Sequence, residues 1–188
     1  RATALLQIDG EVAAAPLAVF SLGAGWATKI WAPERFGELA RRLAASGWRI
    51  ALAWGPGEQA LVEAAWPATG APGAPDFAAR AVGREPGVYV MPPTTFVELG
   101  AVIARAGLFV GGDTGPTHFA AALGVPTVSM MGPLDARRNG PYGARCHTIQ
   151  HGVPRRAPRG CNHRRWCDPA TDLQHVNVDE VWDACRHA

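Results

Sequence analysis

Short apolar segments alternate along the chain with stretches that repeat at the period of a helix. Five apolar segments predict buried strands, at residues 17–25, 49–54, 87–92, 108–112 and 126–132. Helical patterns follow four of them, at residues 33–46, from 59 to about 66, from 96 onward and at 116–123. Strands separated by roughly helix-length crossovers indicate βαβ units, so the sequence predicts an α/β fold built on a parallel sheet.

Proline, glycine and capping residues set the predicted helix boundaries. Pro33 suits a first helical position and Gly47 suits the end of that helix. Residues 67–75 predict a Pro/Gly loop. Thr95 and Glu98 have the spacing of a capping box, followed by a helical stripe of Phe96, Leu99 and Ile103.

The periodic pattern weakens after residue 143. We predict one domain over residues 1–188, with an α/β core at 17–143, an irregular basic loop at 144–175 and a last helix at 176–188. Asn177 is the predicted N-cap of that helix, with Glu180 three residues on. Because the chain begins with Arg1 rather than Met, we expect it to be a piece of a longer protein.

Composition narrows the classes of function. The chain has 188 residues, 48% hydrophobic and 18% charged, which is typical of a globular domain with a full core. Its net charge of +2 gives no strong indication of a nucleic-acid partner. No apolar run reaches membrane-spanning length, and no signal peptide is visible.

The cysteines favour a reduced, cytosolic setting over a disulfide framework. Cys161 and Cys167 lie near His163, but the usual zinc spacings are absent. We therefore predict free thiols and no metal.

Glycine clusters follow four of the predicted strands, at residues 23–25, 55–57, 111–115 and 132. Each cluster alone is an ordinary turn between a strand and a helix. Together they lie at the carboxyl ends of parallel strands, where such sheets bind ligands. The sequence thus predicts a binding site along this edge.

The segment Asp113-Thr114-Gly115 precedes a helix that begins with a proline. We expect Gly115 at the helix cap, with the amides of Gly115, Thr117 and His118 pointing outward to a phosphate or diphosphate. Thr114 would add a hydroxyl, Asp113 would accept hydrogen bonds from sugar hydroxyls, and the His118 ring would donate to a phosphate oxygen. The alternatives are a packed helix histidine and a helix-capping carboxylate.

An aspartic protease also contains Asp-Thr-Gly. That interpretation requires an all-β lobe and a second copy of the motif to form a carboxylate pair. The chain has one copy, followed directly by a proline and a helical pattern. We therefore reject it.

Two further charged residues follow glycine turns at the same edge. Lys29, the only lysine of the chain, would neutralise a diphosphate, although a surface lysine is the simpler interpretation. Glu58, after the second strand, would hold ribose hydroxyls or serve only as a carboxylate at a helix start.

Three segments in this order resemble the carboxyl-terminal half of glycosyltransferase family 9, the ADP-heptose heptosyltransferases and their relatives. They are SLGAGWATKIWAPERFGELARRL (21–43), WGPGE (54–58) and GGDTGPTHFAAALGVPTVSMMGP (111–133), followed by GPYG (140–143). The resemblance implies one Rossmann-like half of an inverting, metal-independent GT-B enzyme that uses no cofactor.

The resemblance also implies roles for individual residues. Lys29 would contact phosphate and sugar, Glu58 the ribose, Thr94 the base and Asp113 the sugar. Around the diphosphate would lie Thr114, Gly115 and His118, with backbone contacts from Gly23, Ala24, Gly25 and Thr117. Two positions depart from the family pattern: Ala24 and Gly25 offer only backbone where hydroxyls are common, and Asp172 replaces a frequent cysteine.

The family's general base and its acceptor surface belong to an amino-terminal domain with no counterpart in residues 1–188. We therefore expect a donor-binding half that is inactive alone and that binds a nucleotide sugar, ADP-heptose by resemblance. The acceptor would be a lipid-linked saccharide bound by the missing domain. The resemblance places the enzyme in the cytoplasm, at the inner face of the bacterial inner membrane, with peripheral membrane contact as a further expectation.

Two alternatives remain open at this point. One is a nucleotide-diphosphate-binding module or an epimerase-like sugar-nucleotide enzyme. The other is a basic interaction domain that uses the arginines of residues 155–165 on an anionic surface.

Overall fold

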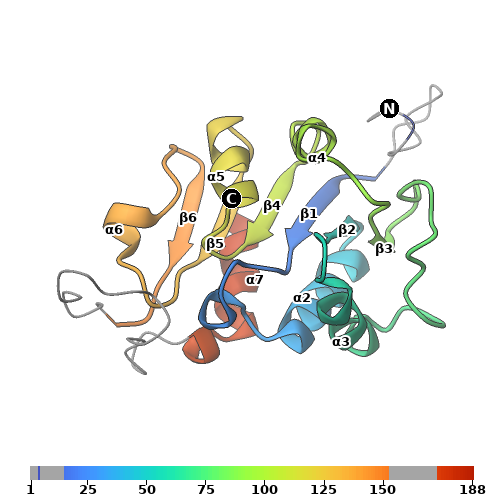
Figure 1. The fold of residues 1–188 in the computed structure, drawn as a ribbon, viewed down its shortest axis with the longest axis horizontal. Coiled ribbons are helices and arrows are strands. Elements are labelled where there is room, and N and C mark those ends of the chain that lie inside the picture. The colour runs from blue at the N-terminus through green and yellow to red at the C-terminus, as the bar shows by residue number, and fades with distance from the viewer. Residues whose placement is uncertain (1–3, 5–14, 153–172) are drawn as a thin grey trace.

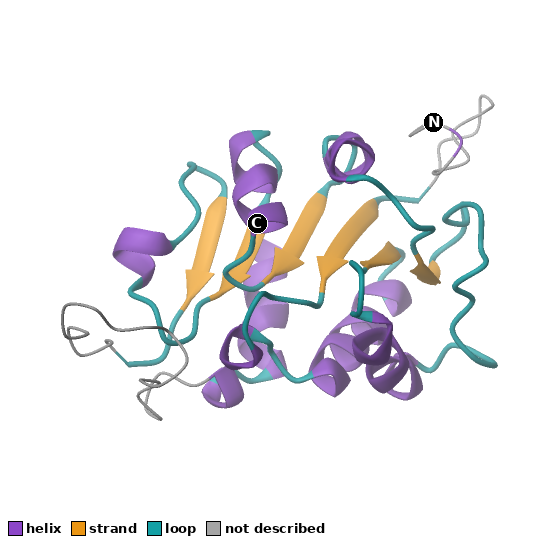
Figure 2. Ribbon diagram, viewed as in Figure 1, coloured by secondary structure: helices purple, strands orange, loops and turns teal. Residues whose placement is uncertain are grey.

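Six parallel strands form one sheet in the order β3-β2-β1-β4-β5-β6. The structure is a computed structural model that describes residue 4, residues 15–152 and residues 173–188. The predicted parallel α/β sheet is confirmed (Figure 2). The strands are β1 (Leu17–Ser21), β2 (Arg49–Ala53), β3 (Gly87–Val90), β4 (Leu108–Gly111), β5 (Thr127–Met130) and β6 (Cys146–Ile149).

The strand order reverses between β1 and β4. Phe20 of β1 pairs with Leu52 of β2 on one side and with Val110 of β4 on the other. The connections from β1 therefore run toward one edge and those from β4 toward the other. They leave a crevice beyond the carboxyl ends of β1 and β4, and in doubly wound sheets of this order ligands bind at that switch point.

Helices cover both faces of the sheet (Figure 1). On one face Phe20 packs in a core cluster with residues of α2 (Pro33–Ala45), α3 (Gln59–Thr69) and α7 (Val178–His187). On the other face Val19 belongs to a second cluster that includes residues of α4 (Phe96–Ile103) and α5 (Gly115–Ala122). Successive residues of β1 thus point to opposite cores, which explains its continuous apolar sequence.

The predicted helix boundaries hold where a capping group defines them. Pro33 is the first residue of α2, and Gly47 after its end has a φ of 92°, a left-handed conformation that glycine adopts without strain. Capping boxes are present at Thr95–Glu98 and at Asn177–Glu180. The first turns of α4 and α7 therefore lie where the sequence places them.

Three elements differ from the prediction. α3 continues through Pro67 to Thr69 and ends at Gly70, so the Pro/Gly loop begins later than residue 67. Residues 146–149, predicted as irregular, form the edge strand β6. A short helix, α6 (Ala136–Asn139), lies before it. The basic loop at 153–172 lies outside the described residues.

Side chains near the end of η1 (Ala27–Lys29) and in α2 hold the last segment of the chain. Trp31 is buried, and its Nε1 donates to the carbonyl oxygen of Val176 at 2.8 Å. The Arg35 guanidinium donates to the carbonyl oxygens of Gln174 and Val176. The short helix η3 (Leu173–His175) and α7 therefore stabilise the region that carries Lys29.

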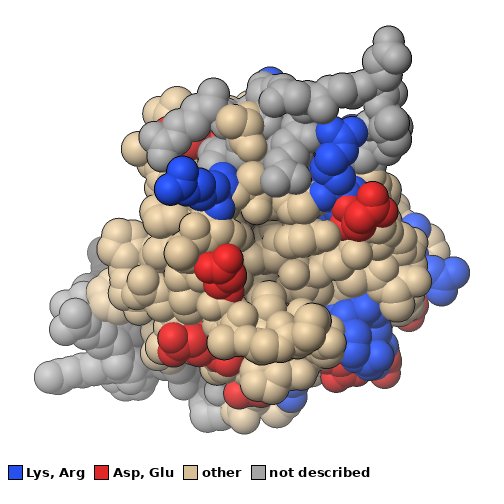
Figure 3. Space-filling model, turned by 90° about the vertical axis from the view of Figure 1, so that its right-hand side faces the viewer, with Lys and Arg blue, Asp and Glu red and all other residues tan. Residues whose placement is uncertain are grey.

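Charged side chains of both signs are scattered over a mainly uncharged surface at the β3 edge of the sheet (Figure 3). No helix in the described part of the chain has the length and apolar character needed to cross a bilayer.

Candidate functional site

A pocket of about 500 Å³ opens at the switch point between β1 and β4. Nine of the eleven predicted site residues line it; Thr117 and His118 do not. The nine are Gly23, Ala24, Gly25, Lys29, Glu58, Thr94, Asp113, Thr114 and Gly115. The topology therefore gathers residues from positions 23–115 into one cavity.

Lys29 enters the pocket from η1, which packs against two glycines. A Cβ added to Gly112 would lie 2.8 Å from the carbonyl oxygen of Lys29, and one added to Gly132 would lie 3.0 Å from that of Thr28. The first distance is shorter than real Cβ contacts and the second is tighter than most of them, so larger residues at these positions would push η1 away. The glycines after β4 and β5 thus allow the lysine to approach the edge of the sheet.

Asp113 lies between the side chains of Lys29 and His118. Its Oδ2 is 2.6 Å from Nζ of Lys29, and its Oδ1 is 3.3 Å from Nε2 of His118. The side chains of Lys29 and Asp113 are only 14% and 10% exposed, whereas that of His118 is 45% exposed. Lys29 is therefore not a free surface lysine, and Asp113 does not cap α5 with its side chain.

The predicted N-cap of α5 is wrong by one residue. Thr114, not Gly115, is the N-cap, with an extended backbone, and its carbonyl oxygen accepts from the amides of both Thr117 and His118. These two amides are therefore not directed at a ligand, and Thr117 is fully buried. Only the Gly115 amide, of the three, has no acceptor among the residues that the structure describes.

Thr117 stabilises the loop instead of facing a ligand. Its hydroxyl donates to the carbonyl oxygen of Gly112 at 2.6 Å and lies 3.2 Å from the hydroxyl of Thr114. This bond ties α5 to the segment just before Asp113, so it restricts the position of that carboxylate.

The Glu58 side chain does not cap α3 and instead folds back onto the turn at residues 55–58. Its Oε2 accepts from the amide of Gly55 at 2.7 Å. A Cβ on Gly23 would overlap the Glu58 carboxylate, so glycine at this position lets the carboxylate lie against the loop after β1. Oε1 of Glu58 accepts no hydrogen bond from the residues that the structure describes.

Aromatic residues that the sequence interpretation missed line the other end of the pocket. Trp54 donates from Nε1 to the carbonyl oxygen of Met91. Phe96, predicted only as part of a helical stripe, is 55% exposed and stacks on Phe119 with ring centroids 5.2 Å apart. The helical period alone places Phe96 beside Ile103, but it does not show that the first turn of α4 faces the pocket.

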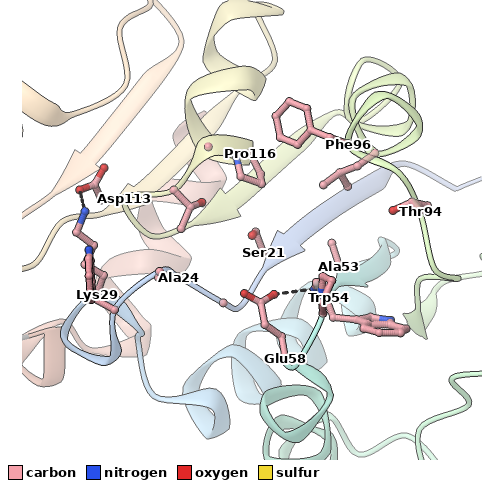
Figure 4. A pocket seen from close by; sticks show the side chains of 18 of the residues that line it. Ser21, Ala24, Lys29, Ala53, Trp54, Glu58, Thr94, Phe96, Asp113 and Pro116 are labelled. Carbon is pink, nitrogen blue, oxygen red and sulfur yellow. Dashed lines mark hydrogen bonds and ion pairs between the residues drawn. The ribbon is translucent and has the colours of Figure 1, made fainter.

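Lys29 and Asp113 lie at one end of the pocket, Thr94 lies at the opposite end, and Ala24 and Glu58 lie between them (Figure 4). From the Lys29 end to the Thr94 end, the cavity thus presents a cation, a glycine turn, a carboxylate and an aromatic end. This sequence of groups suits an elongated ligand with an anionic centre, hydroxyl groups and a planar end.

The protease interpretation requires an all-β lobe, and the parallel sheet with helices on both faces excludes it. Among the described residues, no three His, Cys, Asp or Glu side chains are grouped to hold a metal ion. Cys161, His163 and Cys167 lie outside those residues.

A second cavity, of about 650 Å³, lies beside β3 under the loop after α3. Trp66 Nε1 donates to the carbonyl oxygen of Gly73, and the Tyr89 hydroxyl donates to that of Glu85. Trp66 and Tyr89, the two large polar side chains of this cavity, thus hold the loop. Among the described residues that line the cavity there is no ion pair like that of Lys29 and Asp113.

The chain is similar to heptosyltransferases over most of its length. It is 33% identical to lipopolysaccharide heptosyltransferase 1 of Pseudomonas aeruginosa over 129 residues, which cover 69% of this chain and 32% of the relative. The structure of the E. coli heptosyltransferase WaaC with ADP matches at a TM-score of 0.68 and 26% identity, over 97% of this chain and 47% of that one.

A glycosyltransferase family 9 structure from Veillonella parvula has a TM-score of 0.75 at 20% identity, over 99% of this chain and 49% of that one, which shows a shared fold. The chain thus spans about a third of the length of the Pseudomonas relative and about half of these solved structures. The family model of glycosyltransferase family 9 (heptosyltransferase) matches residues 2–162. With its sheet, its pocket and this match over most of its length, the chain belongs to glycosyltransferase family 9.

Proposed function

We propose that this chain is the donor-binding half of an inverting, metal-independent GT-B glycosyltransferase of lipopolysaccharide core synthesis, with ADP-heptose as donor. Family membership and the names of the relatives support the reaction class. The observation that carries the proposal is the order of groups along the pocket: Thr94, Glu58, the loop at 23–25 and then Lys29 with Asp113. The parts of a nucleotide sugar follow in the same order, from base through ribose and diphosphate to sugar.

Each group has a defined task in this proposal. The Lys29 ammonium neutralises the diphosphate, and the Gly115 amide at the start of α5 donates to it. Glu58 accepts hydrogen bonds from the ribose hydroxyls through Oε1, while Asp113 accepts them from the sugar. His118, exposed beside Asp113, donates to a phosphate oxygen at the rim.

Transfer requires a second set of groups. A base outside the described residues removes the proton of an acceptor hydroxyl, whose oxygen attacks the anomeric carbon from the face opposite the diphosphate. Lys29 and the first turn of α5 stabilise the charge that develops on the leaving diphosphate. In this proposal the acceptor is a lipid-linked saccharide bound by a further domain, no cofactor takes part, and the enzyme works in the cytoplasm beside the inner membrane.

The test is calorimetric titration of the chain with ADP, UDP, GDP and ADP-heptose, repeated on Lys29→Ala. We expect ADP and ADP-heptose to bind in preference and Lys29→Ala to weaken both at least tenfold. Because Lys29 is the only lysine, an amine-specific acylating reagent followed by mass spectrometry gives an independent measurement. ADP should protect this one side chain. A folded chain that binds none of the four ligands contradicts the proposal.

A further inference from the structure

The donor pocket carries more negative than positive charge, although its proposed ligand is an anion. Among the described residues that line it, Lys29 is the one cation, and Glu58 and Asp113 are both carboxylates. The charge of Lys29 is already balanced by Asp113 at 2.6 Å. A diphosphate that binds Lys29 must therefore compete with a carboxylate that is fixed in the site.

The competition is strong because the distances are short. A phosphate oxygen that accepts a hydrogen bond from Nζ of Lys29, at about 2.8 Å, lies within about 5.5 Å of Oδ2 of Asp113. Both side chains are largely buried, so water and salt screen little of their field. Thr117 holds the neighbouring Gly112, which restricts the retreat of Asp113 from the ligand.

The repulsion changes when the sugar is transferred. The bond between the anomeric carbon and the diphosphate oxygen breaks, and its electron pair stays on that oxygen. A bond from the acceptor oxygen to the anomeric carbon forms, and the acceptor proton passes to the base. The released diphosphate now has a terminal phosphate group whose second ionisation is near pH 6, so at neutral pH it carries about one more negative charge than the donor did. The sugar hydroxyls that donated to Asp113 have left.

We propose that Asp113 discriminates between the nucleotide sugar and the spent nucleoside diphosphate. With the donor bound, its carboxylate is compensated by sugar hydroxyls. With the product bound, it faces the added phosphate charge with no such compensation and competes for Lys29. The Lys29–Asp113 pair re-forms as the product leaves, which favours release. This inference rests on the proposed function of the pocket.

The discriminating experiment compares Asp113→Asn with the wild-type chain by titration with ADP and with ADP-heptose. Asparagine keeps the shape and a hydrogen-bond acceptor for the sugar, and it removes the charge. We expect ADP to bind at least fivefold more tightly and ADP-heptose to change less than threefold. The ratio of the two dissociation constants is the readout, because a purely structural effect would weaken both ligands. Asp183→Asn, on an exposed residue of α7 outside the pocket, is the charge-matched control and should leave the ratio unchanged.

Each outcome supports or refutes the discrimination by Asp113. If Asp113→Asn binds both ligands but the ratio does not move, or moves against ADP, the discrimination by Asp113 is refuted while the donor site stands. If the folded wild-type chain binds neither ligand, the proposed function fails and the inference fails with it. Asp113→Ser, also neutral, replaces Asp113→Asn if the latter does not fold. The wild type itself must bind ADP-heptose more tightly than ADP, and the reverse order refutes the inference without any variant.

Discussion

The ion pair between Lys29 and Asp113 should be formed before any ligand binds, and a double-mutant cycle of Lys29→Met and Asp113→Asn measures it. Breaking a fully buried pair costs about 3–5 kcal/mol. Here the side chains are 14% and 10% exposed, and His118 remains near the carboxylate at 3.3 Å. We therefore expect Lys29→Met to lower the free energy of unfolding by about 2 kcal/mol, with about 1.5 kcal/mol of coupling between the two sites.

Urea denaturation of the wild type, both single variants and the double variant gives the coupling. The control is the more exposed pair of Arg137 and Asp135 in and before α6, at 2.9 Å, with side chains 79% and 33% exposed, and it should show no measurable coupling. A coupling below about 0.5 kcal/mol between Lys29 and Asp113 would mean that the pair adds nothing to the unliganded fold. The competition between Asp113 and a diphosphate would then lose its structural basis.

Three further perturbations test the site and the core. Gly112→Ala should lower the free energy of unfolding by about 1–3 kcal/mol, because its Cβ would lie 2.8 Å from the Lys29 carbonyl oxygen; Gly25→Ala, with nothing within 4 Å, should change it little in the same urea titration. Thr117→Val should cost about 1–2 kcal/mol in thermal denaturation, because the Gly112 carbonyl oxygen loses its buried donor; an unchanged melting temperature would contradict this role. Burial raises the pKa of the Cys185 thiol from 9.0 to about 12, so the folded state keeps a proton that the unfolded state loses. This thiol should therefore leave the free energy of unfolding unchanged below pH 9 and lower it between pH 9 and 12. A Cys185→Ala variant whose free energy of unfolding falls equally steeply over that pH range would refute this.

Local sequence signals predicted most of the fold. The apolar segments predicted at 17–25 and 108–112 contain the central strands β1 and β4, since strands covered on both faces leave a continuous hydrophobic pattern. Capping boxes defined the starts of α4 and α7 because they satisfy backbone groups within four residues. The edge strand β6 was missed, since its half-buried and exposed residues, such as Cys146 and His147, carry no such pattern.

For the site, the sequence determined which groups were available, and the tertiary structure decided what each one contacts. The glycines, Lys29, Glu58 and Asp113 could be selected because strand ends in a parallel sheet share one edge. That Lys29 pairs with Asp113, 84 positions away, depends on the close approach of η1 to Gly112 and on the β1–β4 pairing. The amides of Thr117 and His118 are hydrogen-bonded inside the protein because the N-cap of α5 is Thr114, one residue before the predicted Gly115. The exposure of Phe96 depends on how α4 packs beside α5. Local sequence pattern determines the helices and strands because their hydrogen bonds and periodicity are short-range. Which charges are paired and which donors are free in the site depends on contacts between distant segments, and only the packed sheet brings these together.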